Sequence, residues 1–150
     1  MKEAYKEALL AYKLGEVPIG CIIWHDESNK IIGRGHNRRA TEKNVLYHAE
    51  MIAINQACEY MDDWRLEGCH LYVTVEPCPM CAGAILQARI PVVVYGAKNP
   101  KAGCLGSIYN LLDEPRFNHR AEIITGVYEE ECAELMRSFF KDFRKYSKSV

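Results

Sequence analysis

Three side chains in this sequence have the types and the spacing of metal ligands. His48 is followed two residues later by Glu50, and one expected strand further on Cys78 and Cys81 form a Cys-x-x-Cys pair after Pro77. One imidazole and two thiolates are good zinc ligands, and no fourth protein ligand is obvious beside them. A structural zinc site closes its tetrahedron with four side chains, whereas a catalytic site leaves one position for water. The pattern therefore predicts one catalytic zinc ion per chain.

Each half of this pattern has simpler explanations when it stands alone. A Cys-x-x-Cys pair also serves redox chemistry, structural zinc or the burial of small thiols. A carboxylate such as Glu50 can stabilise the N-terminus of a helix through the helix dipole. The combination of both halves, with Pro77 before the first cysteine, is far more specific than either one.

The combined pattern resembles the H-x-E and P-C-x-x-C signature of the zinc nucleobase deaminases. Zinc would lower the pKa of a bound water toward about 7. Glu50 would take a proton from that water and deliver it to the ring nitrogen as hydroxide adds to the amine-bearing carbon. A second proton transfer would let ammonia leave. We therefore expect an enzyme with Glu50 as its catalytic residue and His48, Cys78 and Cys81 as its metal ligands.

The bulk properties of the chain are those of an ordinary globular protein. Its 150 residues suffice for one domain, 1–150, and about half of them are apolar. We expect no secretory signal at the charged start, which has no apolar stretch, and the longest apolar run, Ile90–Tyr95, is too short to cross a bilayer. The odd count of seven cysteines favours a reducing cytoplasm over a disulfide framework. Those outside the ligand set are expected to be small buried hydrophobes: Cys21, Cys58, Cys69, Cys104 and Cys132.

The charge balance argues against indiscriminate coating of nucleic acid. The formal net charge is −1, whereas such proteins need a broad positive field. Local basic clusters exist nonetheless, and charge alone favours interpreting them as two solvated surfaces. They consist of Arg34, Arg38 and Arg39 near the middle, and Lys141, Arg144, Lys145 and Lys148 near the end.

Hydrophobic periodicity predicts alternating strands and helices. Helices are expected at Lys2–Leu14, from His48 to about Tyr60, at Pro79–Ala88 and at Glu129–Lys145. Strands are expected at Ile19–Trp24, Lys30–Gly35, Leu71–Val75, Val92–Tyr95 and Ile123–Val127. The first two strands form a hairpin, and the strand–helix–strand unit within 71–95 requires parallel strands. The fold class is therefore α/β, a mixed central sheet with helices on both faces in three layers.

This arrangement explains how the ligands can meet. His48 and Glu50 start one helix, and Cys78 and Cys81 open the next, so both helix N-termini can converge on one metal. Their unpaired N–H groups and dipoles favour anionic ligands and help to keep the two cysteines as thiolates.

Beyond these motifs, the sequence resembles the bacterial tRNA-specific adenosine deaminases of the cytidine and deoxycytidylate deaminase-like superfamily. The resemblance covers nearly the whole chain. Matching segments are Glu16–Gly20, Gly35–Arg38, Leu71–Ile90, Val94–Ala97, Lys101–Ser107, Phe117–Arg120, Gly126–Val127, Glu131–Cys132 and Phe139–Phe140. Because guanine, cytosine and riboflavin-pathway deaminases share the zinc motif, the C-terminal third distinguishes among them.

The resemblance implies hydrolytic conversion of the wobble adenosine of a tRNA anticodon, typically an arginine tRNA, to inosine. It also implies a homodimer with the RNA near the interface. Asn37 would contact the flipped base beside the backbone of Ala49, and unpaired anticodon-loop bases cost little to splay out. On its own, Asn37 is equally suited to a turn.

The resemblance also gives the C-terminal helix a role in RNA contact. Its aromatic residues Phe139, Phe140 and Phe143 would face the substrate, together with the basic cluster near the end of the chain. Without the family, these residues would be interpreted as a core-packed helix face with solvated lysines.

Two positions depart from the family pattern. Val45-Leu46-Tyr47 stands where Pro-Thr-Ala is usual, in a segment that would line the approach to the pocket. Asn99 replaces a common Asp near the substrate ribose, and Asn can donate and accept hydrogen bonds but lacks the charge. We expect looser discrimination between ribose and deoxyribose as a result.

Two other functions are compatible with the motifs. A free-base or nucleoside deaminase would act on a small molecule and be indifferent to tRNA. A zinc-dependent RNA-binding module would bind RNA without turnover, although an intact Glu50 argues against it.

Overall fold

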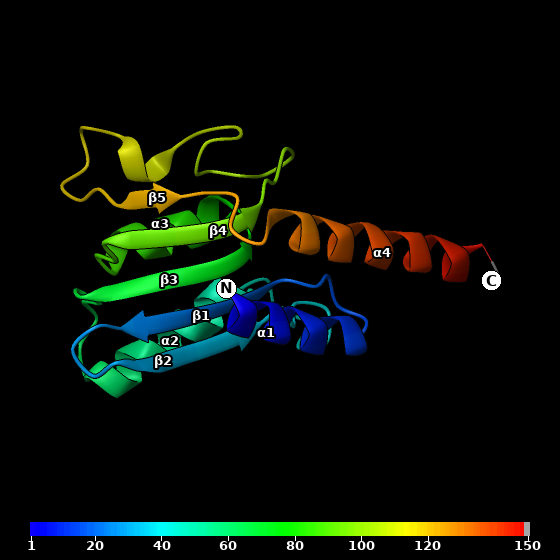
Figure 1. The fold of residues 1–150 in the computed structure, drawn as a ribbon, viewed down its shortest axis with the longest axis horizontal. Helices are drawn as coiled ribbons and strands as arrows, with labels where there is room; N and C mark the ends of the chain where they lie inside the picture. Colours follow the sequence, from blue (N-terminus) through cyan, green and yellow to red (C-terminus); the bar gives the residue numbers. More distant parts are fainter. Residues whose placement is uncertain (149–150) are drawn as a thin grey trace.

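A mixed five-stranded sheet forms the centre of the fold (Figure 1). The structure is a computed structural model that describes residues 1–148. Its strands are β1 (Gly20–His25), β2 (Lys30–His36), β3 (Cys69–Val75), β4 (Val92–Ala97) and β5 (Glu122–Ile124). Its helices are α1 (Lys2–Lys13), α2 (Ala49–Met61), α3 (Pro79–Gln87) and α4 (Glu129–Ser147), with the short 3-10 helix η1 (Leu111–Asp113) before β5. The alternation predicted from the sequence is confirmed.

The strand order is β2-β1-β3-β4-β5. β1 is antiparallel to both β2 and β3, whereas β3, β4 and β5 run parallel. The predicted last strand, Ile123–Val127, is wrong in its bounds, because β5 ends at Ile124. Gly126 and Tyr128 have positive φ angles of 77° and 62°, and these turn the chain away from the sheet into α4.

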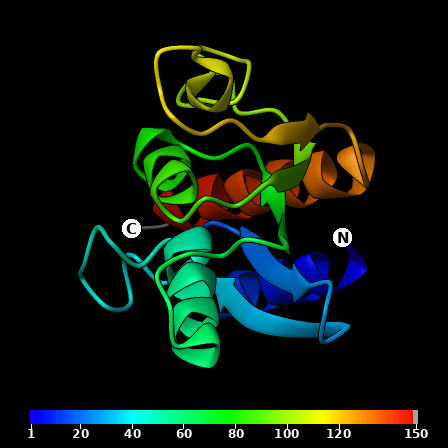
Figure 2. The ribbon, with the colours of Figure 1, turned by 90° about the vertical axis from the view of Figure 1, so that its left-hand side faces the viewer.

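Helices cover both faces of the sheet, as predicted. α2 and α3 lie on one face, and α1 and α4 lie on the other (Figure 2). On the first face, β2 approaches α2 so closely that side chains would not fit between them. A Cβ at Gly35 would lie 2.3 Å from the carbonyl oxygen of Ala49, and one at Gly33 would lie 2.2 Å from that of Ala53. This contact fixes the first turn of α2, where His48 and Glu50 stand.

The core lies between the sheet and the α2–α3 layer. Fully buried large side chains of the core include Ile23, Leu71, Val93 and Ile85 from β1, β3, β4 and α3. Burying one such side chain contributes about 1.5–3 kcal/mol. The cysteines outside the ligand set are buried or, for Cys58, half-buried, as predicted. The helices that carry the ligands are therefore packed against the core of the molecule.

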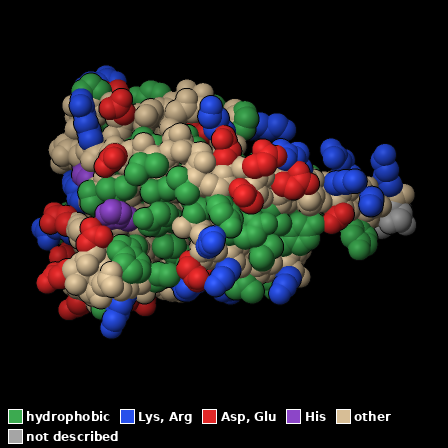
Figure 3. Space-filling view, viewed as in Figure 1, with side chains coloured by type: hydrophobic (Ala, Val, Ile, Leu, Met, Phe, Trp, Pro, Cys, Tyr) green, Lys and Arg blue, Asp and Glu red, His purple; other side chains and the backbone are tan. Residues whose placement is uncertain are grey.

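The other face of the sheet is covered less completely. Apolar side chains gather on the surface between and beside α1 and α4 (Figure 3). The C-terminal half of α4 extends past the end of the sheet (Figure 1). There the Tyr12 hydroxyl of α1 donates a hydrogen bond to Asp142, and the Tyr12 ring packs edge-on against Phe139. Over residues 1–148, no helix combines the length and apolar character that a bilayer span requires.

Candidate active site

The three predicted metal ligands meet at the N-termini of α2 and α3. His48 is the residue immediately before α2, Cys78 precedes α3, and Cys81 lies in the first turn of α3. The His48 Nδ1 atom is 3.6 Å from the Cys78 Sγ atom and 3.5 Å from the Cys81 Sγ atom. All three ligand atoms lie within 4.8 Å of one another, and no second such group occurs within residues 1–148. This is a compact set of nitrogen and sulfur donors.

The two thiols differ in acidity because they share one hydrogen bond. Hydrogen bonds from Cys81 and His48 lower the pKa of the Cys78 thiol to about 4, although burial acts in the opposite direction. The contact with Cys78, together with burial, raises the pKa of the Cys81 thiol. One thiolate is thus prepared by its surroundings, and a divalent cation between the sulfurs would displace the second proton. One imidazole and two thiolates with this acidity fit zinc, the metal that prefers such donors.

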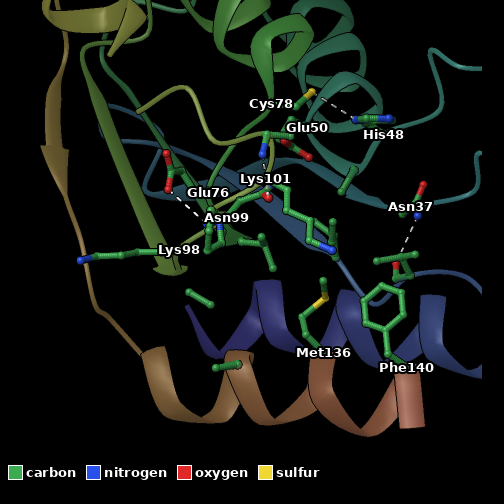
Figure 4. A pocket seen from close by; sticks show the side chains of 18 of the residues that line it. Asn37, His48, Glu50, Glu76, Cys78, Lys98, Asn99, Lys101, Met136 and Phe140 are labelled. Atoms are coloured by element: carbon green, nitrogen blue, oxygen red, sulfur yellow. Dashed lines mark hydrogen bonds between the residues drawn. The ribbon is translucent and has the colours of Figure 1, made fainter. Parts of the chain in front are cut away.

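Glu50, two residues after His48, belongs to the same site. Its side chain is only 4% exposed, and it lies in the first turn of α2. Burial raises the pKa of Glu50, and hydrogen bonds from its own backbone amide and from Cys81 offset only part of that shift. A carboxyl with a raised pKa both accepts and returns protons more readily near neutral pH. Glu50 and Cys78 lie side by side at one end of a cavity (Figure 4).

The cavity has a volume of about 680 Å³, which is the size of a small-molecule site. His48, Glu50 and Cys78 line its inner end. The outer walls come from five other parts of the chain, which are the segment after α1, the segment after β2, the end of β3, the end of β4 with the loop that follows it, and one side of α4. Their lining residues are Val17, Ile19, Asn37, Arg39, Val75, Glu76, Ala97–Ala102, Ala133, Met136, Arg137 and Phe140.

Asn37 and Ala49, the expected contacts of the base, both line this cavity. Ala49 is fully buried at the start of α2. The Asn37 Nδ2 group donates to the Val17 carbonyl at 3.2 Å, and its Oδ1 atom accepts from the Arg39 amide at 3.1 Å. The second bond is the turn role that the sequence left open for Asn37, and the first fixes how the amide faces the cavity.

Asn99 also lines the cavity, in the loop that follows β4. Its side-chain Oδ1 atom accepts a hydrogen bond from the Ala102 backbone amide at 3.2 Å, and its backbone amide donates to Glu76 Oε1 at 3.2 Å. The loop that carries it is therefore ordered by hydrogen bonds rather than by packing alone.

Phe139 is placed differently from its neighbour. Its ring is 8% exposed, packs against Tyr12 with centroids 5.7 Å apart, and is not part of the cavity wall. Phe140, one residue on, is 43% exposed and does line the cavity. The core-packing alternative thus describes the surroundings of Phe139, and the side chain that α4 offers to the cavity at this level is Phe140 (Figure 4).

The central arginine cluster does not act as one surface. Arg34 pairs with Glu3 at 2.6 Å and with Glu7 at 3.4 Å, and Arg38 pairs with Glu42. Only Arg39 lines the cavity. The positive charge at the cavity comes from Arg39 together with Lys98, Lys101 and Arg137, of which Arg137 is also paired with Glu130 and Glu134.

The unusual segment Val45-Leu46-Tyr47 lies beside the site and outside the cavity lining. Val45 and Leu46 are 65% and 53% exposed, on the connection that leads into His48. The Tyr47 carbonyl accepts a hydrogen bond from the Arg38 amide at 3.0 Å, and the Arg38 guanidinium lies over the Tyr47 ring. The departure from the family pattern therefore changes an exposed flank of the site.

Sequence reasoning missed several residues of the outer walls. Ala133, Met136 and Arg137 are among them, and they share a helical spacing of three and four with Phe140, which was expected to contact RNA, so the periodicity of α4 could have identified this face. Glu76 lies within the matched segment before Cys78, but its partners come from residues 99–107, a proximity that no local pattern indicates.

Comparison with known proteins agrees with this geometry. The family model of the MafB19-like deaminases matches residues 1–144. A tRNA-specific adenosine deaminase of Bacillus subtilis is 52% identical over 150 residues, which cover all of this chain and 92% of the relative. A protein of the same name from Rickettsia bellii is 42% identical over 144 residues, covering 96% of this chain and 99% of the relative.

A solved structure extends the agreement to three dimensions. It comes from a study of A-to-I editing by tRNA:A34 deaminases at the wobble position of transfer RNA, and it superposes with a TM-score of 0.85 at 41% identity. The match covers 90% of this chain and 96% of that one.

Proposed function

From its membership of the tRNA-specific adenosine deaminases, the family to which this chain belongs, we propose that it converts the wobble adenosine of a tRNA anticodon to inosine. The substrate is an arginine tRNA, and the reaction consumes one water and releases one ammonia. The observation that carries the proposal is the convergence of His48, Cys78 and Cys81 with the buried Glu50 at the inner end of one cavity.

The metal ligands and the proton shuttle divide the chemistry between them. His48, Cys78 and Cys81 would hold a zinc ion, which would lower the pKa of a water molecule when bound. Glu50 would move the protons: its carboxylate would accept one from the attacking water and give it to the ring nitrogen of adenine. The same carboxylate would then take the proton of the newly added hydroxyl and give it to the departing amine, which leaves as ammonia, so Glu50 works as base and acid in turn.

The outer walls of the cavity hold the nucleotide. Asn37 and the backbone at Ala49 contact the base, and Asn99 faces the ribose. We assign RNA contact to the C-terminal helix, where Phe139 supports Phe140 from behind through ring packing at 5.3 Å. Lys98 and Lys101 add positive charge on the cavity wall, which suits a phosphate backbone.

Three further features complete the proposal. The chain works as one deaminase domain over 1–150, it forms a homodimer with the anticodon loop bound near the interface, and it acts in the cytoplasm. The exposed apolar side chains of the flank, Val45 and Leu46, lie beside the site, where a second protomer or the RNA would cover them.

The test is inosine formation in an unmodified arginine tRNA that carries adenosine at the wobble position. Zinc-loaded protein should convert that adenosine alone, and Glu50→Ala should abolish conversion while it retains zinc. No conversion by zinc-loaded protein would refute the proposal. Assays with free guanine and cytosine would then test a small-molecule deaminase, with Val45–Tyr47 as the segment to exchange.

A further inference from the structure

A buried carboxylate that the proposed chemistry does not use lies in the wall of the cavity. Glu76 lies between β3 and Cys78 and is 2% exposed. Its oxygens accept hydrogen bonds from the backbone amides of Asn99 at 3.2 Å, Leu105 at 3.1 Å and Ser107 at 3.0 Å. The Ser107 hydroxyl donates a further bond. A buried charge is costly unless it is bonded in this way, so its retention here points to a task.

All of these donors belong to one loop. Residues 98–107 follow β4 and bring Lys98, Asn99 and Lys101 to the cavity wall. Within the described chain, the loop carries little regular structure of its own, since it forms turns and one isolated bridge at Leu105. Its amides need acceptors, and the Glu76 carboxylate supplies them at three separate points.

The loop is also tied to the metal-ligand turn. The Cys104 amide donates to the Pro77 carbonyl at 2.9 Å, directly beside Cys78. Gly103 leaves room for the carboxylate, because a Cβ at that position would lie 2.3 Å from the Glu76 Cδ and Oε2 atoms. Glu76, Pro77 and Gly103 therefore form one junction between the inner and the outer parts of the site. Figure 4 shows the bond from Asn99 to Glu76 within this junction.

We propose that Glu76 is a positioning residue that holds the Asn99 side of the cavity at a fixed distance from the Cys78 turn. The inference rests on the proposed function, because it assigns this loop to nucleotide binding. Glu76 acts through the loop rather than on the reacting atoms. A carboxylate is suited to this task because both of its oxygens accept, whereas a glutamine would turn an NH₂ group toward one of the amide donors.

The test compares graded damage to this junction. Ser107→Ala removes one donor and leaves the carboxylate in place, and Glu76→Gln mismatches the whole set. We expect Ser107→Ala to raise the KM for tRNA by about threefold to tenfold, and Glu76→Gln by roughly tenfold or more. The kcat should change less than the KM, because lost positioning of bound nucleotide removes uniform binding.

Ser138→Ala is the matched control. Ser138 is a half-buried serine of α4 that bonds to Glu134 and lies outside the cavity wall, so its loss should leave KM unchanged. Zinc content should stay at one ion per chain in every variant. Backbone amide exchange within 98–107 should accelerate in Ser107→Ala and Glu76→Gln, and not in Ser138→Ala.

The readouts separate this inference from the proposed function. If the parent protein fails to deaminate tRNA, amide exchange still tests the junction without any substrate. Unchanged exchange in 98–107, loss of zinc, or a fall in kcat at constant KM would each overturn the positioning role. If Glu76→Gln does not fold, Ser107→Ala carries the test alone, because it removes only a hydroxyl.

Discussion

The two ends of the cavity are built by different means. At the inner end, His48, Glu50, Cys78 and Cys81 all belong to the first turns of α2 and α3 or to the residues just before them. At the outer end, the walls are a hydrogen-bonded loop and one side of a helix that extends beyond the sheet. The inner end therefore depends on two helix starts, and the outer end depends on contacts between distant segments.

This difference predicts a division of labour. Groups anchored on helix starts next to the core keep their geometry, as transfer of a proton requires. Groups on a loop and on a peripheral helix can adapt to a large and irregular substrate. Changes at the inner end should therefore alter the rate of chemistry, and changes at the outer end should alter which substrate binds and how tightly.

Removal of the metal is the largest expected effect. Treatment with a strong chelator should reduce deamination by roughly a thousandfold or more, because the water would lose its activation. One equivalent of zinc should restore activity, as measured by inosine formation together with elemental analysis. Full activity in protein shown to contain no metal would contradict the assignment of His48, Cys78 and Cys81.

Glu50→Gln should come next in size. Loss of the proton shuttle should lower kcat by roughly 10²- to 10⁴-fold, with little change in KM. Zinc content should stay at the parent value, since no ligand is altered. Single-turnover assays on the tRNA would measure the chemical step directly.

Glu7→Gln is the matched control for this change. Glu7 is also a buried glutamate, but it pairs with Arg34 and His36 between α1 and β2, away from the cavity. The kcat of the Glu7→Gln variant should stay near that of the parent. An equal fall in kcat for both variants would indicate a general loss of structure instead of a lost proton shuttle.

The same comparison explains what the sequence could and could not predict. Cys-x-x-Cys and His-x-Glu are local spacings, so helix geometry alone brings each pair to one face, and the alternation of strands and helices brings the pairs together. The fold layers followed from periodicity for the same reason. By contrast, Glu76 meets Ser107 and Tyr12 meets Asp142 across long stretches of chain, and no local pattern encodes such contacts. β5 also ends before the predicted Val127, because the backbone turns at Gly126 and Tyr128, and the strand propensity of these residues did not indicate that turn.

Alanine substitutions at the neighbouring residues Phe139 and Phe140 test the outer end of the cavity. Phe139→Ala should lower the free energy of unfolding by about 3 kcal/mol, because its ring is buried between α1 and α4. Phe140→Ala should cost less than about 1 kcal/mol and should raise the KM for tRNA by roughly threefold to tenfold. Denaturant unfolding and steady-state kinetics would measure both quantities.

The comparison between the two variants matters more than either value. Because the two rings touch, Phe139→Ala should also disturb Phe140, and some rise in KM is expected at temperatures where the variant is folded. That rise should stay below the one seen in Phe140→Ala. A larger KM effect from Phe139→Ala would mean that Phe139 itself contacts the RNA.

The smallest expected effect concerns Asn99, which faces the outer end through a side chain held by Ala102. Asn99→Asp would replace a group that donates and accepts with one that only accepts and carries a charge, so it should favour the ribose 2′-hydroxyl as a donor. We expect the ratio of kcat/KM for an RNA hairpin over a DNA hairpin of equal sequence to rise by about threefold to tenfold. Equal ratios in Asn99→Asp and the parent would refute this role. Because Glu50 and the metal ligands are unchanged in this variant, its rate at a saturating concentration of the RNA hairpin should stay near that of the parent. A fall in that rate would show that the inner and outer ends of the cavity are coupled rather than separate.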